Sequence, residues 1–90
     1  MQEIAENRPS RHFQSDVFRD YRDVPCPVNF IRIAMDLDAM QIGQIIEVLL
    51  DEKWVVNVLN SLVRDGQTIV DKSNIDGYQA VLIRKTASCD

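Results

Sequence analysis

The sequence predicts an α/β (α+β) two-layer sandwich, with the element order β-α-β-α-β-β and both helices on one face of a mixed four-stranded sheet. Two stretches with helical spacing of apolar residues, 28–41 and 54–65, each separate two strand-like segments. A helical crossover makes the strands it joins parallel and is right-handed, so two crossovers that run the same way place both helices on one face. The turn sequence at 73–77 predicts that the last two strands form an antiparallel hairpin.

The size and charge of the chain exclude several classes of protein. Its 90 residues make one domain. The formal net charge is −4 and no block of Lys or Arg is present, so we expect no direct nucleic-acid partner. No apolar run is long enough to span a bilayer and the N-terminus does not resemble a signal peptide, so we expect no membrane partner. Two cysteines far apart make no disulfide framework, which predicts a reducing, cytoplasmic location.

The two ends of the chain are predicted to be tails around one domain at residues 15–85. Residues 1–14 are mostly polar and follow no sustained period, which predicts a flexible N-terminal tail. The only histidine, His12, lies there and has no partners for a metal site or a catalytic triad. Residues 86–90 form a C-terminal tail, in which Cys89 is expected to be a spectator thiol. We therefore expect no cofactor and no bound metal.

The first strand and the first helix follow from the spacing of apolar residues. Residues 15–21 form a short strand, and residues 22–25 turn the chain. Residues 28–41 carry apolar side chains at i, i+3, i+4 and i+7, which predicts a helix. These side chains are Phe30, Ile33, Ala34 and Leu37, and Met40 extends the stripe. Gly43 is expected to stop the helix.

The second half of the chain begins with a central strand. Residues 44–50 are nearly continuously apolar and rich in β-branched side chains, which suits a strand covered on at least one face. Asp51 is expected to cap the second helix at 54–65, with Glu52 in its first turn. Acid–base chemistry is the alternative for these two carboxylates, and we favour capping. Trp54 could mark a docking surface, but we favour core packing.

The last two strands are predicted at residues 67–72 and 78–84. The second of them runs opposite to the other strands, so Arg84 and Lys85 lie at the far edge of the sheet. The C-terminal ends of the first two strands share the near edge, where ligands and reactive groups gather in open α/β sheets.

A cysteine between two prolines marks the candidate reactive site at that near edge. Cys26 directly precedes Pro27, whose fixed φ and missing N–H suit the first position of a helix. Unpaired N–H groups at a helix N-terminus stabilise an anion, so Cys26 is expected to hold more of the reactive thiolate. Arg22, Arg32 and Lys53 are the expected nearby cations.

We expect Asn29 to hydrogen-bond the loop before Cys26, because Asn readily makes local bonds of this kind. A single cysteine can also be a buried structural residue, and the residues alone leave that alternative open.

The chain resembles the TusA (SirA-like) family of sulfur-carrier proteins over everything but the two tails. The matching residues are Cys26-Pro27, Asp20-Tyr21-Arg22, Met40-Gln41-Ile42-Gly43, Asp51 and Leu82-Ile83-Arg84-Lys85. Members carry a Cys-Pro-x-Pro motif, and here Asn29 replaces its second proline. The sequence also departs from the family at Asp23, where glycine is usual, and at Ile42, where proline is usual. Ala34 and Met35 stand where basic residues are common.

The resemblance implies the strand order 1-2-4-3 and a sulfur carrier. Cys26 would hold sulfur as a persulfide, with Pro27, Asn29, Arg22 and Arg32 in support. The implied donor is a pyridoxal-phosphate cysteine desulfurase, and the acceptor is another sulfur-relay protein or a redox enzyme. Such relays serve tRNA thiolation, cofactor assembly, sulfur oxidation or sulfite and nitrite reduction.

Two hypotheses therefore follow. The first is a sulfurtransferase-like carrier that acts through Cys26, which needs an accessible, reactive thiol. No second cysteine lies near in sequence, which suits a carrier and argues against a Cys-x-x-Cys oxidoreductase. The second is a non-catalytic interaction or regulatory module of the same fold, which docks on a redox or sulfur-metabolism enzyme and tolerates Cys26→Ser.

Overall fold

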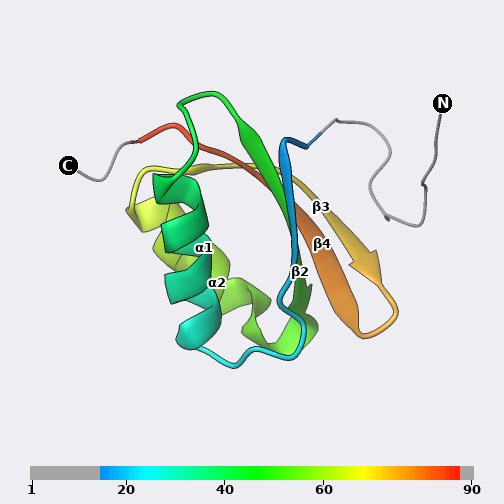
Figure 1. Ribbon diagram of the computed structural model, residues 1–90. Coiled ribbons are helices and arrows are strands. Elements are labelled where there is room, and N and C mark those ends of the chain that lie inside the picture. Colours follow the sequence, from blue (N-terminus) through cyan, green and yellow to red (C-terminus); the bar gives the residue numbers. More distant parts are fainter. Residues whose placement is uncertain (1–14, 88–90) are drawn as a thin grey trace, which may run out of the picture.

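The computed structural model describes residues 15–87, and within them it confirms the predicted element order (Figure 1). The elements in chain order are β1 (Val17–Asp20), α1 (Val28–Asp38), β2 (Ile45–Asp51), α2 (Glu52–Arg64), β3 (Thr68–Ile75) and β4 (Tyr78–Arg84). Both helices lie on one face of the sheet, as the sequence predicts. The predicted flexible tail, His12 and Cys89 lie outside the described residues.

The sheet has the order β1-β2-β4-β3, so β1 and β3 are its two edges. β1 pairs in parallel with β2, from Val17 opposite Ile46 to Asp20 opposite Leu49. β4 is antiparallel to both β2 and β3, which makes the sheet mixed. Parallel pairing brings the C-terminal ends of β1 and β2 to the same end of the sheet, and both helices also begin there.

The bounds of every element except β4 differ from the predicted ones by one to three residues: β1, for example, covers Val17–Asp20 rather than residues 15–21. α1 ends at Asp38 rather than at residue 41, and Gly43, at φ +98°, lies in the turn that follows. α2 begins at Glu52, directly after its cap. β3 continues to Ile75, because residues 73–75 pair with β4 despite their turn-like composition. The hairpin turn is therefore shorter than predicted, and Gly77 supplies its positive φ of +85°.

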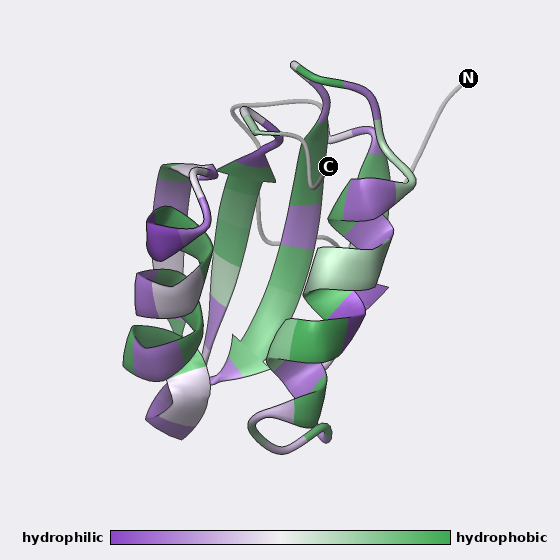
Figure 2. Ribbon diagram, turned by 90° about the vertical axis from the view of Figure 1, so that its left-hand side faces the viewer, coloured by the Kyte–Doolittle hydropathy of each residue, from purple (hydrophilic) through white to green (hydrophobic). Residues whose placement is uncertain are grey.

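The core lies between the helices and the sheet. Alternate residues of β2 face the helices, and these are Ile46, Val48 and Leu50, all buried. Helix residues that pack against them include Ile33, Leu37, Val55, Val58 and Leu62. The central strands are mostly hydrophobic along their length (Figure 2). A charged residue, Glu47, interrupts the apolar sequence of β2. It is buried and alternates with the core residues, so it lies on the face of the sheet away from the helices.

A buried lysine holds the end of α1 against β4. Lys85 Nζ donates to the carbonyl of Met40 at 2.7 Å and to that of Asp38 at 3.5 Å. The terminal carbonyls of a helix lack partners within the helix and carry partial negative charge, so an ammonium group stabilises them. The sequence correctly predicts that Lys85 lies at the end of the sheet opposite to Cys26, but it does not predict the contact of Lys85 with the end of α1.

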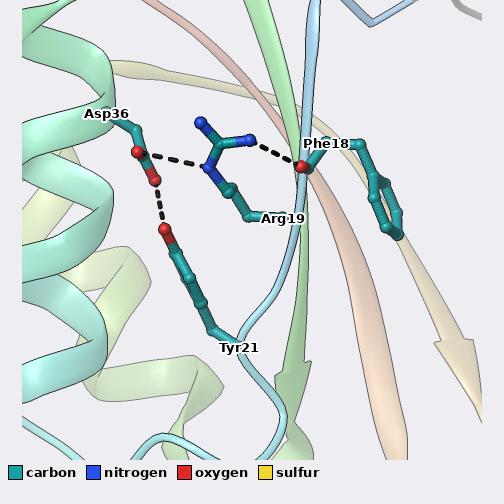
Figure 3. A network of polar contacts seen from close by, with 4 residues as sticks. All are labelled: Phe18, Arg19, Tyr21 and Asp36. Carbon is teal, nitrogen blue, oxygen red and sulfur yellow. Dashed lines mark hydrogen bonds and ion pairs between the residues drawn. The ribbon is translucent and has the colours of Figure 1, made fainter.

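A polar network ties the end of β1 to the middle of α1 (Figure 3). The Tyr21 hydroxyl donates to Asp36 Oδ2 at 2.5 Å, and Arg19 Nε donates to Asp36 Oδ1 at 3.3 Å. Arg19 also donates to the Phe18 carbonyl at 3.0 Å. Burial, followed by the hydrogen bond to Asp36, raises the pKa of Tyr21 above its ordinary value of 10.0. This network fixes α1 relative to the strand that leads into Cys26.

The first prediction concerns Tyr21. Tyr21→Phe removes a hydrogen bond to a carboxylate and should lower the free energy of unfolding by about 1–3 kcal/mol, measured by urea denaturation. Tyr78→Phe is the matched control, because it also removes a hydroxyl but keeps the ring beneath Arg22. Equal effects of the two substitutions would contradict the role of the network.

The raised pKa of Tyr21 also predicts a pH dependence. A raised folded-state pKa means that the unfolded chain loses this proton first as the pH rises. The stability advantage of the wild type over Tyr21→Phe should therefore be constant below the ordinary pKa of 10.0 and decline above it. Urea denaturation at a series of pH values measures this difference, and a difference that grows above pH 10.0 would contradict the assignment.

Candidate functional site

The candidate site is the loop that leads from β1 into α1. Cys26 is half-buried and lies directly before Pro27, across a cis peptide bond. Pro27 is the N-cap of α1, with φ −96° and ψ 7°, and Val28 is the first helical residue. The prediction that Pro27 occupies the first helical position is thus wrong by one residue. Its cap conformation lies outside the helical region, and Cys26 still sits just outside the helix N-terminus.

The first backbone N–H groups of α1 have unequal surroundings. The Asn29 N–H donates to the Pro25 carbonyl and the Ile31 N–H to the Pro27 carbonyl, each at 3.0 Å. The Phe30 N–H donates to Asn29 Oδ1 at 2.6 Å. Within residues 15–87, no acceptor binds the Val28 N–H. This donor, two residues after Cys26, is therefore the one left for an anion at the helix N-terminus.

Asn29 is completely buried beneath the first turn of α1. Its Oδ1 accepts from Phe30, and its Nδ2 has no hydrogen-bond partner among the described residues. The predicted side-chain bond to the loop before Cys26 is therefore wrong, and the bond to Pro25 comes from the backbone N–H instead. A role for the Asn29 side chain at Cys26 stays a prediction.

The expected cations have partners of their own. Arg22 donates to both carboxylate oxygens of Asp20, at 2.9 and 2.8 Å, and its guanidinium carbon lies 4.6 Å from the centroid of the Tyr78 ring. The hydrogen bond from Arg22 holds the pKa of Asp20 below its ordinary value of 3.8. Lys53 Nζ lies 5.4 Å from the centroid of the Trp54 ring. Direct pairing of these two cations with Cys26 is not observed in residues 15–87.

Arg32 is the remaining expected cation. It is exposed on α1 and forms no ion pair within the described part of the chain. Its charge is therefore available to a ligand or a partner rather than committed to an internal contact.

The contacts of Asp51, Glu52 and Trp54 at the start of α2 favour a structural role for these residues. Asp51 Oδ1 accepts from the Lys53 N–H at 3.0 Å, which confirms Asp51 as the N-cap, and Glu52 lies in the first turn. Trp54 packs against the core. Capping and core packing thus account for these three residues.

No three His, Cys, Asp or Glu side chains gather as a metal site in residues 15–87. Neither helix in that part of the chain has the length and apolar composition needed to cross a bilayer.

The C-terminal edge of the described region is held by Gln67. Gln67 Oε1 accepts from the Thr86 N–H at 2.9 Å and from the Ala87 N–H at 3.3 Å, and its Nε2 donates to the Ala87 carbonyl at 3.1 Å. These two residues, which the sequence assigns to a tail, thus bind the start of β3. Thr86 and Ala87 follow β4 and therefore lie at the end of the sheet opposite to Cys26.

A comparison with models of protein families gives a match. The model of a protein family described as sulfurtransferase TusA matches residues 19–85, which run from β1 to the residue after β4 and include Cys26. No curated protein is similar enough to the chain to count as a match.

The buried amide of Asn29 is expected to stabilise the first turn of α1. Asn29→Ala removes the acceptor for the Phe30 N–H and leaves a cavity, so the free energy of unfolding should fall by about 1–2 kcal/mol in urea denaturation. Asn57→Ala is the control, because Asn57 is exposed on α2. If both variants are as stable as the wild type, Asn29 does not support the first turn of α1.

Proposed function

The chain belongs to the TusA sulfurtransferase family, and from this premise we propose that it carries sulfane sulfur as a persulfide on Cys26 and passes it to an acceptor protein in a sulfur relay. A general sulfurtransferase role follows from the family.

The observation that carries the proposal is the position of Cys26. Cys26 is a free cysteine that is partly exposed as a residue, and it lies just before the N-terminus of α1, within the residues that the family model matches. The Val28 N–H, which has no acceptor in residues 15–87, supplies a donor for a nearby thiolate or persulfide anion. A buried structural cysteine would need neither this exposure nor this donor.

The proposed step is an exchange of one sulfur–sulfur bond for another. The Cys26 thiolate attacks the terminal sulfur of a donor persulfide, a new S–S bond forms, and the donor cysteine leaves as a thiolate. The terminal sulfur keeps its oxidation state, so the transfer needs no external oxidant or reductant. An acceptor thiolate then attacks the terminal sulfur in the same way and regenerates the Cys26 thiolate.

The supporting residues have distinct proposed roles. Pro27 fixes the chain at the helix cap, and Asn29 holds the first turn through Phe30. Arg22, bound to Asp20, shapes the loop before Cys26. Arg32 remains free of ion pairs in the described residues and adds positive potential to the helix surface.

The proposed donor is a cysteine desulfurase, and the proposed acceptor is a sulfur-relay protein or a redox enzyme. We propose that the protein acts in the cytoplasm, because a carrier needs its thiol reduced before loading and the cytoplasm keeps thiols reduced. tRNA thiolation is one pathway that such a relay serves.

The test is the intact mass of the protein after incubation with a cysteine desulfurase and cysteine. The wild type should gain one sulfur atom, and a reductant should remove it. Cys26→Ser should gain none, whereas the matched control Cys89→Ser should gain sulfur like the wild type.

Loading of Cys26→Ser to the same extent as the wild type would contradict the proposal. No loading of the wild type, by desulfurase or by a small persulfide such as glutathione persulfide, would favour the non-catalytic interaction module.

A further inference from the structure

Four residues in the middle of the sheet are buried on the face away from the helices. Glu47 and Leu49 on β2 are 2 and 5% exposed, and Ala80 and Leu82 on β4 are 3 and 2% exposed. Glu47 lies opposite Leu82, and Leu49 lies opposite Ala80, so the four side chains share one face, and we call them the outer patch. Both helices cover the other face, and none of the three apolar members of the patch belongs to the core between the two layers (Figure 1).

The sequence of the two central strands is typical of strands that are covered on both faces. Residues 45–50 of β2 are apolar except for Glu47, and residues 80–83 of β4 are all apolar. A sheet with one face in water alternates apolar and polar residues, whereas near-continuous apolar runs occur in strands that are buried on both faces. Within residues 15–87, the helices supply a cover for one face only. The cover of the outer patch must therefore come from outside that range.

Glu47 determines the chemistry that this cover must have. A carboxylate is almost never fully buried unless a cation or hydrogen-bond donors compensate for its lost hydration. Glu47 does have an electrostatic or hydrogen-bonding partner, but the ion pairs of Arg19 and Arg22 within residues 15–87 are made with other carboxylates. A segment that covers the outer patch should therefore present a cation to Glu47 and apolar side chains to its three neighbours.

The N-terminal segment, residues 1–14, contains these groups. It has two arginines, Arg8 and Arg11, and the aromatic residue Phe13. The three residues at the other end of the chain, 88–90, include no lysine or arginine. Of the two ends of the chain, only the N-terminal one can therefore supply a guanidinium group to Glu47.

The attachment point of this segment lies close to Glu47. Asp16 is held beside β2, because its N–H donates to the Ile45 carbonyl at 2.7 Å and its Oδ2 accepts from the Ile45 N–H at 2.9 Å. Glu47 is two residues further along β2. An extended chain from Arg11 to Ser15 spans about 13–14 Å, and neighbouring strands lie about 4.8 Å apart. The segment can therefore cross from β1 to the outer patch.

We propose that residues 1–14 dock on the outer patch, with Arg8 or Arg11 paired with the Glu47 carboxylate and Phe13 packed on the apolar members of the patch. The proposal goes beyond sulfur transfer and does not depend on it. It assigns a structural role to a segment for which the sequence predicts a flexible tail. Covalent attachment gives the segment a high effective concentration at the patch, so a few contacts suffice to hold it there.

A second copy of the chain fits the outer patch less well. A two-fold pairing of outer patches would bring two Glu47 carboxylates together, which is unfavourable for like charges. The patch is also buried in a single chain, so its cover requires no second molecule. A segment of the same chain is therefore the better occupant.

Limited digestion of the full chain with trypsin tests the docking. Trypsin needs access to an arginine side chain, and cleavage follows the fraction of molecules in which the segment is open. Glu47→Gln removes the charge but keeps the shape of the side chain, and it should speed cleavage after Arg11 about tenfold. The matched control Glu52→Gln makes the same change at an exposed position on α2 and should be cleaved like the wild type.

Cleavage after Arg64, at the end of α2, reports opening of the domain itself. It should proceed at the same rate in the wild type and in Glu47→Gln, which separates release of the segment from general unfolding. Equal rates of cleavage after Arg11 in the wild type and in Glu47→Gln would overturn the docking.

A double-mutant cycle keeps the test decisive if Glu47→Gln weakens the whole domain. Arg8→Gln combined with Arg11→Gln should lower the equilibrium constant of folding about tenfold in the wild-type background. The same pair should change it by less than about twofold when Glu47→Gln is already present. Urea denaturation measures these constants. An equal reduction in both backgrounds would overturn the pairing with Glu47.

Two other sources of the cover are distinguished by the same variants. Arg84 is the cation that ends β4, and coupling of Glu47→Gln to Arg84→Gln, in place of the N-terminal arginines, would overturn the proposal. A wild-type dimer in sedimentation that Glu47→Gln dissociates would assign the outer patch to self-association and would also overturn it. A monomeric wild type that is protected at Arg11 is the result that the proposal predicts.

Discussion

The parallel pairing of β1 with β2 is the constraint on which the site depends. It places the end of β1 at the sheet edge where β2 also ends, and the chain must then cross over through α1 to reach β2. Cys26 lies at the point where that crossover begins. The bond from Tyr21 to Asp36 fixes the helix to the strand end, and Lys85 holds the other end of the helix. The position of the thiol is therefore set by the sheet and not by the loop alone.

The proposed chemistry requires little beyond this placement. An exchange between sulfur atoms needs an accessible thiolate and an approach path for the partner sulfur. The helix N-terminus supplies positive potential and the Val28 N–H, while Arg22 and Lys53 are engaged by Asp20 and Trp54. Specificity for the partner is then expected to depend on the surface around Cys26.

The element order, the hairpin and the capping role of Asp51 could be predicted because each has a local signal: apolar spacing, turn residues or a side-chain acceptor. The family resemblance added the strand order. The end of α1 could not be predicted, because the contact with Lys85 is remote in sequence. Pairing with β4 similarly extends β3 to Ile75 against its turn-like composition. The burial of Asn29 and the exposure of Met35 depend on how α1 is rotated against the sheet.

The most direct test of the account is to locate transferred sulfur within the chain. After loading by a cysteine desulfurase, tandem mass spectrometry of proteolytic peptides identifies which cysteine carries the extra sulfur atom. The account predicts the sulfur on the peptide that contains Cys26, and its loss when an acceptor thiol is added. Sulfur found on the peptide with Cys89, or retained on Cys26 in the presence of the acceptor, would contradict a carrier that acts through Cys26.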